Sequence, residues 1–260
     1  MALRGRNAVI TGSNGGIGHA FAVALAAEGC NIVINGPGDA SELETSRAAI
    51  QDMGVTCLYS PADVGKPAEV AQLISLAEDQ LGSVDILINN AAIRHFHPVD
   101  EFPPDEWDAA LAVNLSAAFH TIRLALPGMK RRNWGRIINM GSIYSLRGQA
   151  ERIDYVTAKH ALIGITKTVA IETAKTGITC NALQPGWVLT PHSERQIAAR
   201  IASAGCSREQ AIEALLQSRQ PSRRIITMEE VAAFAVFLCS DSARNITGSG
   251  LSIDGGWAAL

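Results

Sequence analysis

The sequence has little that would take the protein to a membrane or to a nucleic acid. No apolar run in its 260 residues approaches the roughly 18 uninterrupted residues that a membrane-spanning helix needs. The opening stretch, MALRGRNAVITG, lacks the apolar core of a signal peptide. The 22 Lys and Arg residues are slightly outnumbered by 25 Asp and Glu residues, which gives a net charge of −3. These absences predict a cytoplasmic protein with no membrane or nucleic-acid partner.

Cysteine is also sparse. The five cysteines are odd in number and scattered, and no two of them form a Cys-x-x-Cys pair. The histidines show no metal-ligand spacing along the chain either. We therefore expect reduced thiols, as in a cytosolic protein, and no metal site.

The chain is organised by an alternation of apolar β-type runs and longer helix-type stretches. No linker, low-complexity tract or internal repeat divides it, and 47% of its residues are hydrophobic, which predicts a single domain over residues 1–260. Near-continuous apolar strands between helices are typical of an α/β protein with a doubly wound (Rossmann) parallel sheet and helices on both faces. The predicted strands are residues 7–11, 31–35, 56–60, 86–89, 136–140, 178–183 and 251–253. The predicted helices are residues 16–28, 41–53, 67–80, 105–130, 154–175 and 228–240.

One segment, residues 190–226, breaks this alternation. It has helix-like patches at 193–203 and 208–218 but no strand before the last helix. An insertion after the carboxyl end of a strand is well placed to be a small helical lid. A rigid surface excursion explains the pattern equally well at this stage.

Three polar residues form a possible proton-transfer set. Tyr155 and Lys159 lie four residues apart, so on a helix they share one face. An ammonium beside a phenol lowers the phenol pKa from about 10 toward neutral pH. Ser142 follows an apolar strand, at the edge where open α/β sheets bind ligands. Taken alone, the Tyr-x-x-x-Lys spacing also fits an ordinary surface pair.

A glycine-rich turn joins the first predicted strand to the first helix. It reads Gly12-Ser13-Asn14-Gly15-Gly16-Ile17-Gly18. Glycines allow the backbone to approach a pyrophosphate, and a helix N-terminus offers free N–H groups to it. In this position the turn predicts dinucleotide binding rather than a simple tight connection.

These motifs together resemble the short-chain dehydrogenase/reductase family. The glycine spacing of Gly12, Gly16 and Gly18, the run Asn89-Asn90-Ala91-Ala92, and the later Ser142, Tyr155-x-x-x-Lys159 and Pro185-Gly186 occur in that order over the whole chain. One departure is Ala92, where the family usually has glycine. The resemblance implies that the cofactor contacts Gly12, Ser13, Asn14, Gly16, Ile17, Gly18, Asp63, Val64, Asn89, Asn90, Ala91, Tyr155, Lys159, Pro185, Gly186, Val188 and Thr190.

The resemblance also assigns catalytic roles. Tyr155 would be the general acid/base, Lys159 would tune its pKa and anchor the ribose, and Ser142 would orient the substrate oxygen. Asn114 would hold a water between Lys159 and solvent. The alternative for Asn114 is a buried polar residue satisfied by backbone.

The cofactor is expected to be NAD. The stretch that ends the second predicted strand, residues 31–39, has no Lys or Arg to pair with the 2′-phosphate of NADP. Asn14 and Gly15 are also uncharged. Asp39 lies a few residues late for an acidic ribose ligand.

Several long stretches are most similar to bacterial members of the family that oxidise D-3-hydroxybutyrate, which implies a small 3-hydroxy acid as substrate. Gln196 and Trp257 match positions that close on the substrate there. The alternatives are a solvated lid-helix residue for Gln196 and interface packing near the C-terminus for Trp257. Arg94, Tyr144 and Arg152 stand where glutamine, histidine and lysine are usual, and His192 where leucine is common. The substrate is then 3-hydroxybutyrate or a more polar or dicarboxylic relative, because Arg94 adds a second cation. A 3-oxoacyl-thioester reductase or a polyol or sugar dehydrogenase remains the alternative, and the resemblance implies a homotetramer.

Overall fold

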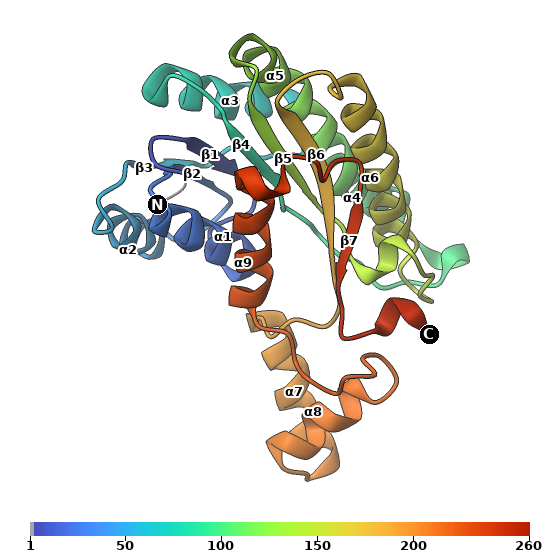
Figure 1. Cartoon of the computed structure of the whole chain (residues 1–260). Helices are drawn as coiled ribbons and strands as arrows, with labels where there is room; N and C mark the ends of the chain where they lie inside the picture. The colour runs from blue at the N-terminus through green and yellow to red at the C-terminus, as the bar shows by residue number, and fades with distance from the viewer. Residues whose placement is uncertain (1–2) are drawn as a thin grey trace.

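The computed structural model describes residues 3–260, and its centre is a sheet of seven parallel strands. The strand order is β3-β2-β1-β4-β5-β6-β7, as Figure 1 shows. The order reverses between β1 and β4, so the chain leaves these two neighbours in opposite directions and a crevice opens at their carboxyl ends. The strands are β1 (Asn7–Ile10), β2 (Asn31–Asn35), β3 (Cys57–Ser60), β4 (Ile86–Asn89), β5 (Gly135–Met140), β6 (Ile178–Pro185) and β7 (Gly250–Ile253).

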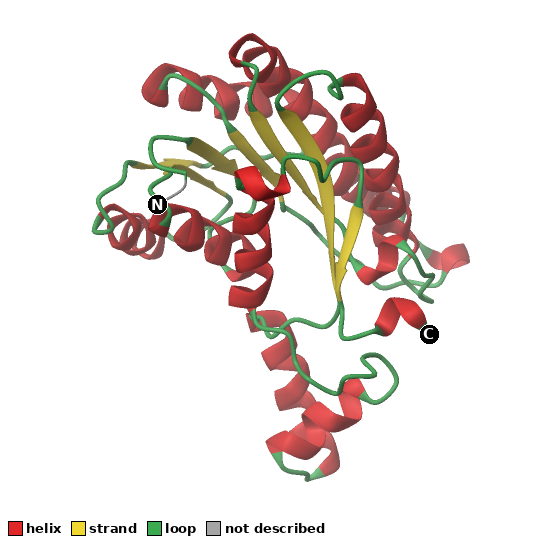
Figure 2. Ribbon diagram, in the orientation of Figure 1, coloured by secondary structure: helices red, strands yellow, loops and turns green. Residues whose placement is uncertain are grey.

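Helices cover both faces of this sheet, in the three layers that Figure 2 shows. Helices α1, α2 and α9 pack on one face, and α3, α5 and α6 pack on the other. Two further helices, α7 and α8, project beyond the carboxyl ends of the strands. The helices are α1 (Gly16–Ala27), α2 (Ala40–Gln51), α3 (Pro67–Leu81), α4 (Pro104–Leu111), α5 (Ala117–Arg132), α6 (Ile153–Glu172), α7 (Pro191–Ala204), α8 (Arg208–Leu216) and α9 (Met228–Cys239).

The apolar strands bury both of their faces in two separate cores. In β1, Ala8 and Ile10 point toward α1 and α9, whereas Val9 points toward α3 and α5. This period of two explains why the strands read as continuous apolar runs, because neither face meets water. The predicted doubly wound fold is confirmed.

One predicted element is wrong in detail. The helix expected over residues 105–130 is broken into α4 and α5 by a π-helical turn, η2, at Ala112–Ser116. The whole stretch Pro104–Arg132 is, among the described residues, long and apolar enough to cross a membrane by composition. Its α5 part nevertheless packs against the sheet as a core helix, with Ile122, Ala125 and Met129 buried.

The helices between β6 and α9 match the two helical patches predicted there. Thr190 caps α7 and Ser207 caps α8, each accepting a hydrogen bond from the backbone three residues later. A single β-bridge between Val188 and Ile226 closes the base of the projection. Both of its ends are therefore held together at the sheet edge, next to the crevice.

A buried polar network fixes the strand ends beneath the crevice. The Asn89 amide of β4 donates to the Asn139 oxygen of β5 at 2.9 Å, and the Asn139 amide donates to the Thr166 hydroxyl of α6 at 2.9 Å. The Thr121 hydroxyl of α5 donates to the Asn89 oxygen at 2.6 Å. Because unpaired buried amides are costly, this network holds two strands and two helices in one relative position.

Candidate active site

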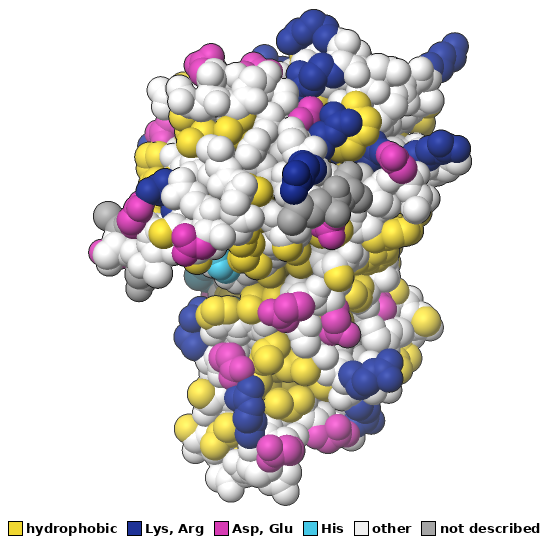
Figure 3. Space-filling view, turned by 60° about the vertical axis from the view of Figure 1, so that its left-hand side comes forward, with side chains coloured by type: hydrophobic (Ala, Val, Ile, Leu, Met, Phe, Trp, Pro, Cys, Tyr) yellow, Lys and Arg dark blue, Asp and Glu magenta, His cyan; other side chains and the backbone are white. Residues whose placement is uncertain are grey.

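Two adjoining cavities occupy the crevice at the carboxyl ends of the strands. A groove of about 720 Å³ runs over the β1–α1 turn and the ends of β2 and β3. A cavity of about 260 Å³ lies between β5, α6 and the α7 projection. Figure 3 shows the hollow between the body of the molecule and the α7–α8 projection, edged by hydrophobic side chains. The residues that line both cavities are Ile17, Asn90, Ala92, Arg94, Thr190 and His192.

The glycine turn has no room for larger side chains at two of its positions. Gly12 has a φ of +62°, and a Cβ there would lie 2.8 Å from the Ala91 Cα atom. A Cβ on Gly18 would lie 2.2 Å from the Gly12 carbonyl oxygen and 2.5 Å from the Asn90 amide. That amide donates to the carbonyls of Thr11 and Gly12, which closes the turn from β4. Helix α1 begins at Gly16, within this glycine-rich segment, so the residues present fit a pyrophosphate.

Most residues predicted to hold the cofactor line one of the two cavities. Those lining the groove are Gly12, Asn14, Gly16, Ile17, Gly18, Asp63, Val64, Asn90, Ala91 and Thr190. Those lining the smaller cavity are Tyr155, Lys159, Pro185, Gly186, Val188 and Thr190.

The side chains of Ser13 and Asn89 turn away from the groove, and their predicted contacts with the cofactor stay a prediction. The Ser13 hydroxyl points inward, where it donates to the Ile10 carbonyl at 2.7 Å and accepts from the Asn35 N–H at 2.9 Å. Its N–H donates to the Asn35 carbonyl at 2.7 Å, so neither group faces the groove. Asn89 belongs to the buried network below the crevice rather than to the ribose region. Sequence spacing located both residues but did not tell which way their side chains turn.

The groove carries no positive charge at the end of β2. Asn35, Gly36 and Pro37 form this wall, and among the described lining residues Arg94 is the one Lys or Arg residue. The Asn14 amide donates to the Pro37 carbonyl and so spans the wall. Asp39 does not line the groove, and its carboxylate accepts from the Ser41 N–H at the start of α2.

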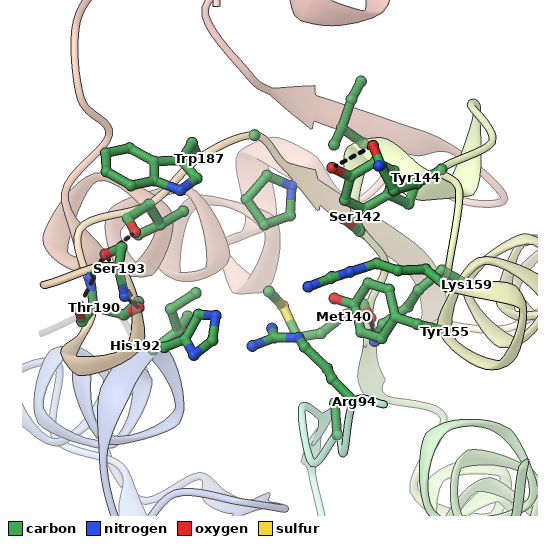
Figure 4. Close-up of a pocket in the computed structure, with 18 of the residues that line it drawn as sticks. Arg94, Met140, Ser142, Tyr144, Tyr155, Lys159, Trp187, Thr190, His192 and Ser193 are labelled. Carbon is green, nitrogen blue, oxygen red and sulfur yellow. Dashed lines mark hydrogen bonds between the residues drawn. The ribbon is translucent and has the colours of Figure 1, made fainter. Parts of the chain in front are cut away.

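Tyr155 and Lys159 lie side by side on the first turns of α6 and point into the smaller cavity, as Figure 4 shows. The exposed fractions of the two residues are 5% and 2%. The Lys159 Nζ atom lies 5.3 Å from the centre of the Tyr155 ring and donates to the Met140 carbonyl at the end of β5. Ser142 follows that strand and lines the same cavity. The structure thus brings together the three residues that the sequence predicted.

Opposing influences set the acidity of Tyr155. Burial raises the pKa of the phenol, but the charges of Lys159 and Arg94, with hydrogen bonds from Arg94 and Ser142, outweigh it. The net effect lowers the pKa of Tyr155 from 10.0 to about 8. Burial also lowers the pKa of Lys159, which the neighbouring Tyr155 partly offsets. A phenol of this acidity exchanges a proton readily near neutral pH.

Asn114 lies on the π-helical turn and is buried. Its amide donates to the Ile93 carbonyl at 2.9 Å, and its oxygen accepts from the Ile93 N–H at 2.8 Å. The side chain therefore fixes the loop that follows β4. The predicted role in holding a water near Lys159 stays a prediction, and π-helical turns do recur at functional sites.

Two arginines point into the smaller cavity. The Arg94 Cζ atom lies 5.1 Å from the centre of the Tyr155 ring, and the Arg152 Cζ atom lies 5.7 Å from it. Arg152 also stacks on Phe96, with its Cζ atom 4.1 Å from that ring centre. Burial, and then repulsion by Arg94, lower the pKa of Arg152. None of the described residues lining this cavity is Asp or Glu.

The remaining predicted substrate residues lie around these arginines. Tyr144 packs edge-on against Tyr155 and Trp257, with ring centres 6.4 and 5.8 Å apart. The Gln196 oxygen of α7 accepts from the indole of Trp187 at 3.2 Å, and its amide meets the His192 ring at 3.2 Å. His192 faces Arg94 across the cavity (Figure 4).

Phe96 and Trp187 are two of the cavity residues that sequence reasoning missed, and Arg219 is another. Phe96, the platform beneath Arg152, gives no signal in the sequence, because an exposed aromatic ring in a loop follows no period. Trp187 follows Pro185 and Gly186 directly and could have been found from that position. Across residues 3–260, no group of three or more His, Cys, Asp or Glu side chains is placed to hold a metal ion.

Comparison with known proteins identifies the family. A family model described as enoyl-(acyl carrier protein) reductase matches residues 12–258. D-beta-hydroxybutyrate dehydrogenase of Cupriavidus necator is 47% identical over 99% of this chain and 99% of its own length, and the protein of the same name from Rhizobium meliloti is 45% identical over 98% and 99%. The crystal structure of L-sorbose reductase from Gluconobacter frateurii, complexed with NADPH and L-sorbose, superimposes with a TM-score of 0.94 and is 31% identical, covering 100% of both chains.

A doubly wound sheet whose dinucleotide groove ends at a buried tyrosine–lysine pair defines an oxidoreductase that uses a nicotinamide cofactor. The chain belongs to the short-chain dehydrogenase/reductase family.

The glycine turn yields a matched pair of substitutions. Gly18→Ala should lower the free energy of unfolding by about 1–3 kcal/mol and weaken NADH binding, because the added Cβ meets the Gly12 carbonyl oxygen. Gly15→Ala is the control, since its φ of −175° is extended and a Cβ there meets nothing within 4 Å. Thermal melts and NADH fluorescence titrations measure both. Equal behaviour of the two variants would contradict the role of the close approach at Gly18.

Proposed function

We propose that this protein oxidises a small 3-hydroxy acid to the 3-oxo acid with NAD, reversibly. The observation that carries the proposal is a buried tyrosine–lysine pair facing a cavity whose described lining includes Arg94, Arg152 and Arg219 and no carboxylate. The pair provides acid/base chemistry, and the arginines provide a site for the acid group of the substrate.

The roles of the residues follow from their positions. Bound NAD would supply the hydride acceptor, held by the glycine turn and by the lining residues of the groove. Tyr155 takes the proton of the substrate hydroxyl, Lys159 and Arg94 stabilise the phenolate that does so, and Ser142 orients the same hydroxyl. In the reducing direction Tyr155 returns the proton to the alcohol oxygen.

The preference for NAD is supported by the uncharged wall at the end of β2. A 2′-phosphate placed there would meet Asn35, Gly36 and Pro37 and no cation. The related sorbose reductase was crystallised with NADPH, but that describes the cofactor of that protein. The prediction for this chain rests on its own uncharged wall.

Two substrates of one class fit the cavity. The names of the hydroxybutyrate dehydrogenase relatives favour D-3-hydroxybutyrate, with its carboxylate on Arg152. The second cation, Arg94, favours a related 3-hydroxy acid with a second carboxylate or additional oxygens. A neutral polyol leaves both guanidinium groups without a counter-charge, which disfavours a polyol or sugar dehydrogenase. An acyl-thioester reductase has less support, because it would place an uncharged thioester beside the two arginines.

The chain acts as one domain, with α7 and α8 as a lid over the smaller cavity. Gln196 and His192 of α7 line that cavity, so a movement of α7 would open or close it.

We further propose a homotetramer, supported by exposed apolar side chains on the long helices, with Phe119 of α5 exposed by 52% and Ile171 of α6 by 78%. Cys30, Cys57, Cys180, Cys206 and Cys239 are all free thiols, which supports a cytoplasmic location.

The proton role of Tyr155 predicts a pH profile. Below its pKa of about 8 the group is protonated and cannot accept the alcohol proton. The kcat/KM for oxidation should therefore rise about tenfold per pH unit below that value and level off above it. Tyr155→Phe should lose about 10²-fold or more in kcat yet bind NADH normally. A variant that retains turnover would refute the role.

The choice of cofactor predicts a preference for NAD over NADP of about 10- to 100-fold in kcat/KM. Asn14→Arg places a cation beside Gly36 and should narrow this ratio. Steady-state kinetics with both cofactors measure it, and equal kcat/KM values for the native protein would contradict the proposal.

The substrate class is tested with a panel of 3-hydroxybutyrate, 3-hydroxy dicarboxylic acids and neutral secondary alcohols. Arg152→Gln should raise KM for every acid by about 10- to 100-fold, because one charge-assisted contact is lost. Arg94→Gln should impair a dicarboxylic substrate more than 3-hydroxybutyrate. Arg200→Gln, on the exposed face of α7, is the control for loss of a positive charge. Neutral alcohols that outperform every acid would exclude both substrates.

A further inference from the structure

Asp154 is a fully buried carboxylate that the proposed chemistry does not use. It lies in the first turn of α6, directly before Tyr155, with an exposed fraction of 0%. One of its oxygens accepts from the Tyr155 N–H at 2.5 Å. The other accepts from the His95 ring Nδ1 at 3.0 Å and from the His95 N–H at 3.3 Å. A single carboxylate therefore ties the start of α6 to the loop that follows β4.

That loop carries Arg94, which is held on both sides. The residue before it, Ile93, exchanges two hydrogen bonds with the Asn114 side chain. The residue after it, His95, is bound to Asp154. Arg94 itself is exposed in the crevice, and within residues 3–260 it forms no ion pair with a carboxylate. Its place beside the Tyr155 ring, 5.1 Å from Cζ to the ring centre, therefore combines its own hydrogen bond to Tyr155 with the anchoring of the residues on either side of it.

We propose that Asp154 and His95 are positioning residues that hold the guanidinium of Arg94 against Tyr155, so that Arg94 acts with Lys159 as a second cation on the catalytic phenolate. The buried Asp154 sets the distance, because it bonds the backbone of Tyr155 and the residue next to Arg94 at once. Loss of the tie frees Arg94 to turn toward solvent, whereas Lys159 stays fixed by the Met140 carbonyl.

The charged groups around this unit are few. Tyr155 faces Lys159 from α6, Arg94 from the β4 loop, and Arg152 from the segment before α6. The lid contributes His192, which faces Arg94.

His95 in turn faces Asp154 and, with its Nε2 atom 3.9 Å away, Glu106 of α4. His97 bonds the same Glu106 at 2.8 Å but does not reach Asp154. His97 therefore shares the loop, the carboxylate of α4 and the ring type of His95 without taking part in the tie, which makes it a matched control.

The first test follows ionisation of Tyr155 in the free protein by the ultraviolet absorbance of tyrosinate, with Tyr155→Phe subtracted to remove Tyr59 and Tyr144. His95→Leu should raise the titration midpoint of Tyr155 by up to about one pH unit, because a nearby cation is lost. His95→Asn should restore most of the native midpoint, since its amide N–H can replace the ring Nδ1–H. His97→Leu should leave the midpoint unchanged. Asp154→Asn breaks the tie from the other side and should repeat the result of His95→Leu.

The second test asks whether the tie acts through Arg94. In an Arg94→Gln background, His95→Leu should shift the midpoint no further. The proposal would be overturned if His95→Leu shifted the Tyr155 midpoint equally with and without Arg94. It would also be overturned if neither His95→Leu nor Asp154→Asn shifted the midpoint. A purely structural role would lower the melting temperature of His95→Leu and His97→Leu alike without moving the midpoint.

The kinetic arm rests on the proposed oxidation of 3-hydroxy acids. In His95→Leu, the pH at which kcat/KM levels off should rise together with the titration midpoint of Tyr155. In His95→Asn, it should return toward the native value. The absorbance titration needs no substrate, so a failure of the substrate proposal leaves the positioning proposal testable by itself.

Discussion

The site depends on an ammonium and a phenol that are both buried at the wall of one cavity. Burial favours the neutral forms of Tyr155 and Lys159, because it raises the pKa of the phenol and lowers the pKa of the amine. Burial alone would therefore disfavour a phenolate beside an ammonium. Their proximity, together with the hydrogen bond that the Lys159 ammonium donates to the Met140 carbonyl, makes the charged pair accessible near neutral pH. Every element that brings α6 against the end of β5 therefore serves this one electrostatic balance.

The sheet supplies the rigidity that such a balance needs. Asn89, Asn139, Thr121 and Thr166 join β4, β5, α5 and α6 directly beneath the pocket. An apolar core would pack these elements as tightly but would tolerate small rotations. Directed hydrogen bonds between buried amides do not, because a rotation leaves a donor unpaired. The network thus sets the orientation of α6, and with it the direction of the Tyr155 hydroxyl.

The sequence was most informative where a residue pattern follows directly from a packing constraint, as it does for the apolar strands and the glycine turn. Apolar runs located all seven strands, because the strands in the middle of the sheet are buried on both faces. Glycine spacing located the groove, because the Gly18 position admits no side chain. Side-chain direction was beyond such reasoning: Ser13 and Asn89 turn into the fold, although their neighbours line the groove. The π-helical turn at Asn114 was also hidden, since one extra residue in a helical turn barely alters an apolar pattern.

The charge distribution of the crevice follows from the same architecture. The chain has a net charge of −3, yet the described lining of the smaller cavity includes Arg94, Arg152, Lys159 and Arg219 and no acidic residue. Fields in a cleft with low-dielectric walls are focused rather than screened, so this cavity attracts anions even though the molecule as a whole repels them. Arg94 also lines the dinucleotide groove. In the proposed reaction, Arg94 therefore stands where the substrate anion, the Tyr155 phenolate and the cofactor would share one cation, and its position would influence all three.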